Sequence, residues 1–135
     1  MTAWLLKTEP HTFSFDDLVK AGVEPWNGVA NQTALRNMRE AKLGDNCVIY
    51  HTGDDKRAVG IATVVKTAYP DPTLTDPKMI VIDVKVAHAL ARPVTLAEMK
   101  ADPRFADSVI ARQGRLSVAP LNDEQYQAIL NWDAK

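Results

Sequence analysis

The sequence lacks several features that would place a protein in a specialised class. It holds a single cysteine, Cys47, so an intrachain disulfide and a cysteine-rich metal site are both excluded. Its apolar runs are short compared with the roughly twenty residues that cross a bilayer as a helix. The first residues carry neither the charged segment nor the cleavage pattern of a signal peptide. We therefore expect a soluble, cytoplasmic protein with no membrane partner.

An excess of charge of one sign is lacking as well. Sixteen Lys and Arg residues against seventeen Asp and Glu residues give a net charge of −1. Non-specific affinity for nucleic acid comes mostly from a cationic field. The composition therefore excludes a polybasic protein that binds nucleic acid over a general surface, but it leaves open a small basic cleft on a neutral protein.

What remains of the composition is typical of a folded domain. The chain has 135 residues, of which 46% are hydrophobic, and this predicts one domain spanning residues 1–135. A chain of this size buries enough surface to form a core without disulfides. Eight prolines against six glycines favour strand ends and turns over a helical bundle.

Hydrophobic patterning predicts a sheet in the middle of the chain, with helices before and after it. β-branched and alternating segments predict strands over residues 3–7, 47–52, 58–69 and 79–90. Capping patterns predict helices that begin after Ser14, Asn31, Thr95 and Asn122, the second of them over 32–42. Residues 112–118 are predicted to form a basic loop. The fold class is α+β, with a mixed or antiparallel sheet that can curl into a barrel.

Signatures of several enzyme classes are absent from the sequence. It has no glycine-rich phosphate loop, no G-x-S-x-G and no H-E-x-x-H. His51 with Asp54 and Asp55 is the nearest approach to a metal cluster, and a turn rich in aspartate is the simpler interpretation. We predict no metal, no cofactor and no catalytic residue.

Aromatic and polar residues gather instead at the junctions between predicted elements. Trp26 lies in a loop flanked by proline and glycine, and Tyr50 and His51 end a predicted strand. Two interpretations of Trp26 stay open. It plugs the edge of the core, or it is a platform for a planar ligand, since aromatic stacking contributes about 1–3 kcal/mol per base. His51 in isolation is interpreted as a structural histidine.

Six ordered segments make the sequence similar to the EVE domain, and the likeness covers nearly the whole chain. The segments are W-L-L-K-T-E-P at 4–10, W-N-G-V-A-N at 26–31, G-D at 44–45, Y-H-T at 50–52, V-G-I-A at 59–62 with Y-P-D-P at 69–72, and R-L-S-V at 115–118. The resemblance implies a PUA-like fold, which is a small, partly closed mixed β-barrel with flanking helices.

The resemblance also implies a non-catalytic module that binds nucleic acid carrying a modified base, such as a methylated base flipped into a pocket. DNA is the first candidate partner and RNA the second, and a monomer is expected. The family pattern maps the pocket onto Lys7, Glu9, Trp26, Gly28, Val29, Asn31, Tyr50, His51, Thr52, Arg112, Gln113, Leu116 and Ser117.

These residue types suit a flipped base, which offers a π-face and a hydrogen-bonding edge. Rings can stack on the base, polar groups can bond to its edge, and cations can hold flanking phosphates. The candidates are, in that order, Trp26 and Tyr50, then Asn31, Thr52 and Ser117, then Lys7, Arg112 and Arg115. With so few cations, we expect modest, salt-sensitive affinity.

The sequence departs from the family pattern at two positions. Ala30 stands where the family usually has arginine, which removes a cation, and Thr52 stands where serine is common. Thr52 keeps the hydroxyl, so that change is mild. Arg36 lies further along the following predicted helix and is the candidate to replace the missing arginine.

Two other hypotheses stay open beside the modified-base reader. One is an enzyme acting on a nucleobase or a small planar metabolite, with Glu9 and His51 as acid and base. The other is a module that binds a small molecule or a protein, which a Trp26 buried in the core without an adjacent cavity would favour.

Overall fold

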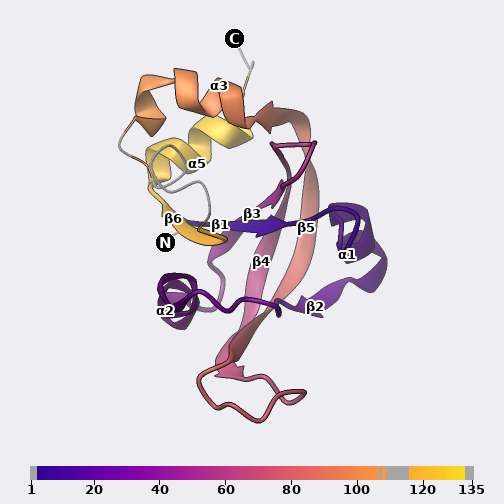
Figure 1. The fold of residues 1–135 in the computed structure, drawn as a ribbon. Coiled ribbons are helices and arrows are strands. Elements are labelled where there is room, and N and C mark those ends of the chain that lie inside the picture. Colours follow the sequence, from indigo (N-terminus) through magenta and orange to yellow (C-terminus); the bar gives the residue numbers. More distant parts are fainter. Residues whose placement is uncertain (1–2, 107, 109–115, 133–135) are drawn as a thin grey trace.

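The fold is built on one mixed sheet of six strands, in the order β2-β5-β4-β3-β1-β6 (Figure 1). This computed structural model describes residues 3–106, 108 and 116–132. The strands are β1 (Ala3–Thr8), β2 (Val23–Pro25), β3 (Asn46–His51), β4 (Arg57–Pro70), β5 (Ile80–Thr95) and β6 (Val118–Leu121). The predicted α+β class, with a mixed sheet, is confirmed.

One pair of strands is parallel, and this pair determines where the rest of the chain must go. β1 runs parallel to β3, with Lys7 opposite Tyr50 and Thr8 opposite His51. The other pairs in the sheet are antiparallel. Parallel neighbours need a long crossover connection. Here it contains α1 (Phe15–Ala21), β2 and α2 (Gln32–Glu40).

The two longest strands bend the sheet without closing it. β4 and β5 pair as a long hairpin whose register shifts at several points along its length. Such bulges increase the twist and bend of a strand. The sheet ends in two short strands, β2 and β6, which contain Pro25 and Pro120. Prolines and short edge strands limit pairing with other chains.

The helices begin where the sequence predicts. The side chains of Ser14, Asn31, Thr95 and Asn122 each cap a helix by accepting a backbone N–H, and they open α1, α2, α3 (Leu96–Ala101) and α5 (Asp123–Leu130). A short 3-10 helix covers Pro103–Phe105. In Figure 1, α3 and α5 lie together at one end of the molecule, and β2 lies between α1 and α2.

Two boundaries and two short strands differ from the sequence-based expectation. α2 ends at Glu40 rather than at residue 42, because the Lys42 N–H donates to the Asp45 carboxylate at 2.9 Å and the chain turns. β5 extends to Thr95 instead of stopping at residue 90, since it follows the full length of β4. β2 and β6 were not predicted, and Val118 belongs to β6 rather than to a loop. Both strands are too short to show a period in the sequence.

A close contact between β4 and α1 fixes the start of that helix against the sheet. Gly60 of β4 lies directly under the ring of Phe15, so a Cβ at that position would overlap the ring. Phe15 is buried. The absence of a side chain at Gly60 therefore lets the first residue of α1 pack directly on β4. Among the described residues, no helix is long and apolar enough to cross a membrane.

Candidate functional site

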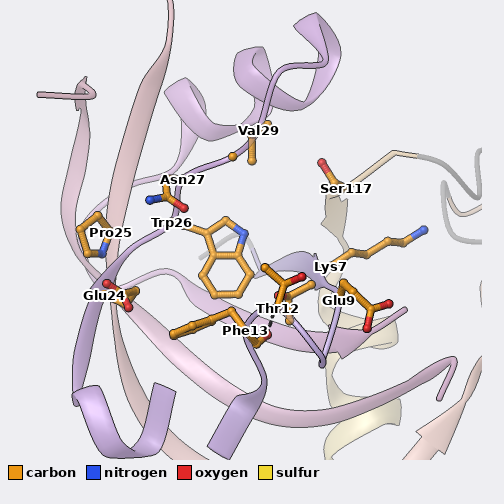
Figure 2. A pocket seen from close by; sticks show the side chains of 12 residues that line it. Lys7, Glu9, Thr12, Phe13, Glu24, Pro25, Trp26, Asn27, Val29 and Ser117 are labelled. Carbon is orange, nitrogen blue, oxygen red and sulfur yellow. Dashed lines mark hydrogen bonds between the residues drawn. The ribbon is translucent and has the colours of Figure 1, made fainter. Parts of the chain in front are cut away.

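A cavity of about 450 Å³ opens where β1 ends, beside β2 and the loop that leads to α2 (Figure 2). This volume lies within the ~300–1,000 Å³ typical of small-molecule pockets. The cavity is lined by Lys7, Thr8, Glu9, Thr12, Phe13, Glu24, Pro25, Trp26, Asn27, Gly28, Val29 and Ser117. We refer to it as the Trp26 pocket.

Trp26 forms the aromatic wall of this pocket. Its side chain is part of the hydrophobic core and is only 6% exposed, yet it borders the cavity. The ring of Phe13 meets it edge-on, with centroids 6.2 Å apart and an interplanar angle of 82°. Its backbone N–H donates to the carbonyl of Ile82 in β5 at 2.7 Å. Trp26 therefore packs in the core, as one interpretation expects, and it also lines a cavity. Its use as a platform for a planar ligand stays a prediction.

Phe13 is held in place by a tight turn after β1. The N–H groups of Thr12 and Phe13 both donate to the carbonyl of Glu9 at 2.9 Å. The hydroxyl of Thr8 donates to the carbonyl of Phe13 at 2.6 Å. Backbone groups in an irregular segment are thus paired, and the aromatic wall has a rigid support.

The loop after Trp26 carries the pocket toward α2. Gly28 has a φ of +78°, which disfavours residues with a side chain. Asn31 ends the loop and accepts the Ala34 N–H at 3.0 Å as the cap of α2. The side chain of Asn31 is thus engaged with the helix rather than with the cavity.

Lys7 brings positive charge to the pocket. Its ammonium group lies over the ring of Tyr50, 5.6 Å from the centroid, and its backbone N–H donates to the carbonyl of Ser117 at 2.9 Å. Partial burial, with a smaller contribution from Lys100, lowers the pKa of Lys7 below its usual range. A partly desolvated cation interacts strongly with a phosphate or another anion.

Two carboxylates border the same cavity. Glu9 accepts the His11 N–H at 2.9 Å, and its carboxylate packs on the turn at Gly53, where a Cβ would lie 2.6 Å from Oε2. Glu24 lines the cavity from β2 (Figure 2). Carboxylates accept hydrogen bonds from exocyclic amino groups such as that of cytosine.

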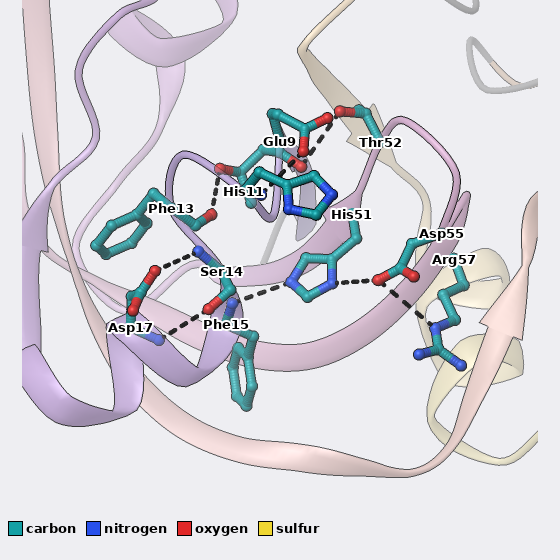
Figure 3. Close-up of polar contacts among 11 residues, drawn as sticks. Glu9, His11, Phe13, Ser14, Phe15, Asp17, His51, Thr52, Asp55 and Arg57 are labelled. Atoms are coloured by element: carbon teal, nitrogen blue, oxygen red, sulfur yellow. Dashed lines mark hydrogen bonds and ion pairs between the residues drawn. The ribbon is translucent and has the colours of Figure 1, made fainter.

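His51 has a structural position beside the site (Figure 3). Its Nε2 atom accepts the Phe15 N–H at 3.0 Å, and its Nδ1 atom lies 2.9 Å from the Asp55 carboxylate. Since Phe15 supplies the proton at Nε2, the imidazole is neutral and carries its own proton on Nδ1. The bond from His51 is the main cause of the lowered pKa of Asp55. Both ring nitrogens are occupied, so this geometry gives His51 no free nitrogen for acid–base chemistry.

The structure brings about half of the predicted site residues together. Around the Trp26 pocket lie Lys7, Glu9, Trp26, Gly28, Val29 and Ser117. The other described candidates do not line it: Asn31, Tyr50, His51, Thr52 and Leu116. Arg112 and Gln113 lie outside the described residues. The assignment of all these residues to ligand binding stays a prediction.

Predicted site residues that do not line the cavity make structural contacts next to it or in the core. Thr52 donates to the carbonyl of Thr8 through its N–H at 2.9 Å and its hydroxyl at 3.3 Å. Tyr50 is buried under Lys7, and burial raises the pKa of its phenol. Leu116 is buried in the core.

Sequence reasoning missed half of the lining. The missed residues are Thr8, Thr12, Phe13, Glu24, Pro25 and Asn27. Pro25 and Asn27 flank Trp26 in the sequence, and that adjacency was a usable signal. Phe13 reaches Trp26 only through the fold, so no local pattern pointed to it. Among the described residues, no group of three His, Cys, Asp or Glu side chains is placed to hold a metal ion.

The bent mixed sheet and its flanking helices define a small α+β domain of the PUA-like type, which contains an aromatic-walled cavity. The sequence matches the EVE domain family over residues 2–132. The chain belongs to the EVE domain family. This confirms the resemblance on which the expected fold was based.

Homologous proteins support the same assignment. The chain is 28% identical to human thymocyte nuclear protein 1, covering 98% of this chain and 74% of that protein. It is 32% identical to the chicken protein of the same name, covering 95% and 67%.

Solved structures agree with the fold along the whole chain. Rpa0253 from Rhodopseudomonas palustris superposes with a TM-score of 0.91 at 39% identity, covering 97% of this chain and 92% of that one. Human THYN1 protein, solved in complex with DNA containing 5-methylcytosine, superposes with a TM-score of 0.89 at 28% identity, covering 100% and 99%. An ASCH protein from Zymomonas mobilis shares the fold, with a TM-score of 0.60 at 16% identity.

Proposed function

We propose that this protein binds nucleic acid and recognises a modified base, which it takes into the Trp26 pocket. DNA carrying a methylated cytosine is the first candidate ligand, and RNA carrying a modified base is the second. The observation that carries the proposal is the wall formed by Trp26 and Phe13 beside a cavity of about 450 Å³. The likeness to a human protein solved with 5-methylcytosine DNA supports the choice of ligand.

The pocket offers a base the two kinds of contact that it needs. The indole of Trp26 and the edge of Phe13 provide apolar surface for the ring and for an added methyl group. Glu24 and Asn27 provide acceptors, and the Asn27 amide also provides a donor. A base inside a duplex reaches such a pocket only after it is flipped out of the stack.

The charge distribution favours a module that recognises one base over a protein that binds nucleic acid non-specifically through a broad cationic surface. Lys7 is the described cation that lines the pocket, and the whole chain has a net charge of −1. Binding should therefore depend on the base more than on the backbone.

The test is a titration of oligonucleotides that differ in one base. Single-stranded and duplex DNA carrying 5-methylcytosine, 5-hydroxymethylcytosine or N6-methyladenine are compared with unmodified DNA, and modified RNA is tested in parallel. We expect tighter binding to at least one modified strand. Equal affinity for modified and unmodified strands would overturn the proposal.

A matched pair of variants locates the pocket. Trp26→Ala should remove the preference, with an affinity loss of about five- to 150-fold, because base stacking contributes ~1–3 kcal/mol. Trp132→Ala is the control, since Trp132 contacts Phe105 and does not line the pocket. If Trp26→Ala still prefers the modified strand, the modified base binds outside the Trp26 pocket.

A further inference from the structure

A second cavity, of about 520 Å³, lies between α2 and the connection from β4 to β5. Ala30 and the charged side chains of Arg36, Arg39, Asp76 and Lys78 line it. We refer to it as the α2 groove. Val29 lines the Trp26 pocket and Ala30, the next residue, lines the α2 groove, so one loop borders both cavities.

The α2 groove is basic, although the protein as a whole is not. Three cationic side chains face one carboxylate in its lining. That carboxylate, on Asp76, accepts the Lys78 N–H at 2.9 Å and so stabilises its own turn. Within the described part of the chain, Arg36, Arg39 and Lys78 form no ion pair. Their charges therefore remain available to an anion.

The fold brings the backbone positions of the three cations together. Arg36 and Arg39 lie three residues apart on the exposed face of α2, where side chains at this spacing are neighbours. The buried face of α2, with Leu35 and Met38, attaches the helix to the core. The Nη2 group of Arg39 donates to the carbonyl of Lys78 at 2.9 Å, which joins α2 to the hairpin connection.

The position of the α2 groove relates it to the pocket. Consecutive Cα atoms are 3.8 Å apart, so the two cavities approach each other at Val29 and Ala30. A strand that places one base in the Trp26 pocket would carry its next phosphates past Ala30. Ala30 itself has no charge to offer them, and Arg36 and Arg39 lie on the helix that follows.

We propose that the α2 groove binds the phosphodiester backbone of the strand next to the base held in the Trp26 pocket. The inference rests on the proposed function, and it adds a second contact surface to that site. Arg36, Arg39 and Lys78 are its phosphate ligands. They position the strand and do not distinguish one base from another.

The experiment measures how binding depends on salt. An oligonucleotide of about twelve nucleotides, within the range of site sizes known for single-stranded nucleic-acid binding by OB folds, carries one central 5-methylcytosine. Its affinity is measured between ~50 and ~200 mM salt for the wild type and for the triple variant Arg36→Gln, Arg39→Gln, Lys78→Gln. Each phosphate contact on a single strand contributes about 0.7 to the slope of log affinity against log salt. We expect the slope to fall by about 2, with the ratio of modified to unmodified affinity unchanged.

The control is Lys20→Gln. Lys20 belongs to α1, which lies across β2 from α2, and the substitution should leave the slope nearly unchanged. A slope that stays the same in the triple variant overturns the inference, and so does an equal fall in Lys20→Gln. If the wild type binds without base preference but its salt slope falls in the triple variant, the α2 groove binds phosphates, and both the proposed function and the link between the groove and a base in the Trp26 pocket fail. If the preference remains and the slope does not change, the inference alone fails.

Discussion

The Nε2 atom of His51 accepts the backbone N–H of Phe15 at 3.0 Å, across 36 positions of sequence. This bond joins the end of β3 to the first residue of α1 (Figure 3). With Asp55 on the other ring nitrogen, His51 connects three segments behind the Trp26 pocket. The residue therefore supports the site from outside.

Replacing His51 should destabilise the fold. In His51→Ala the buried N–H of Phe15 loses its partner, and we expect the free energy of unfolding to fall by about 2–3 kcal/mol. Urea denaturation measures the change. His11→Ala is the control, because the His11 side chain is exposed and the hydrogen bond of this residue to Glu9 comes from its backbone N–H. A loss as large in His11→Ala would contradict this role.

Because of Asp55, the free energy of unfolding should decrease as the pH falls into the acid range. Its pKa is lowered, first by the bond from His51 and further by the charges of Arg57 and His11. A lowered pKa means that the folded state binds fewer protons than the unfolded state, whose aspartates titrate near 3.9. The stabilisation is therefore present above about pH 4 and is lost as the pH falls through the folded pKa.

The pH prediction is checked with two substitutions. Asp55→Asn should be less stable than the wild type at neutral pH, and the difference should shrink as the pH falls. Asp54→Asn changes the neighbouring carboxylate in the same turn and serves as the control. A difference that does not depend on pH would count against the proposed role of the carboxylate.

Phe13 should strengthen ligand binding by holding Trp26. Edge-to-face pairs contribute about 0.5–1.5 kcal/mol beyond their buried area. We therefore expect Phe13→Leu to weaken binding of the preferred oligonucleotide about two- to tenfold. Phe13→Tyr keeps the ring and should retain the affinity. If Leu and Tyr at this position behave alike, the edge contact does not support the pocket.

Lys7 should strengthen oligonucleotide binding and lower the free energy of unfolding. Burial lowers its pKa, so the folded state disfavours the charge. Lys7→Met should raise the free energy of unfolding by about 0.5 kcal/mol and weaken oligonucleotide binding. Because the unfolded state keeps its proton up to a higher pH, wild-type stability should rise relative to Lys7→Met as the pH approaches 10.5.

The matched control for Lys7 is Lys85→Met, which replaces an exposed lysine on another strand. We expect its stability to change by less than about 0.5 kcal/mol and its binding to be unaffected. Thermal and urea unfolding give the stabilities, and the oligonucleotide titration gives the affinities. A Lys7→Met variant that loses stability and keeps full affinity would refute the prediction.

The sequence predicted what depends on neighbouring residues. Ser14, Asn31, Thr95 and Asn122 begin their helices as expected, because a cap bonds to an amide three residues away. Trp26, Gly28 and Val29 line one wall because they follow one another in the chain.

The sequence did not predict what depends on distant pairing. β2 exists because three residues pair with β5, and three residues show no period. Phe13 meets Trp26 through the fold, and the role of His51 depends on an amide of another segment. Each of these relationships is set by the packing of the sheet, which a local pattern does not contain.

The parallel pairing of β1 with β3 places most of the Trp26 pocket lining in one stretch of the chain. All of the pocket lining except Lys7, Thr8 and Ser117 comes from residues 9–29, inside the crossover that this pairing requires. Substitutions in that one stretch can change what is recognised while the long hairpin preserves the scaffold. Substitutions confined to residues 9–29 would therefore be enough to alter most of the pocket lining.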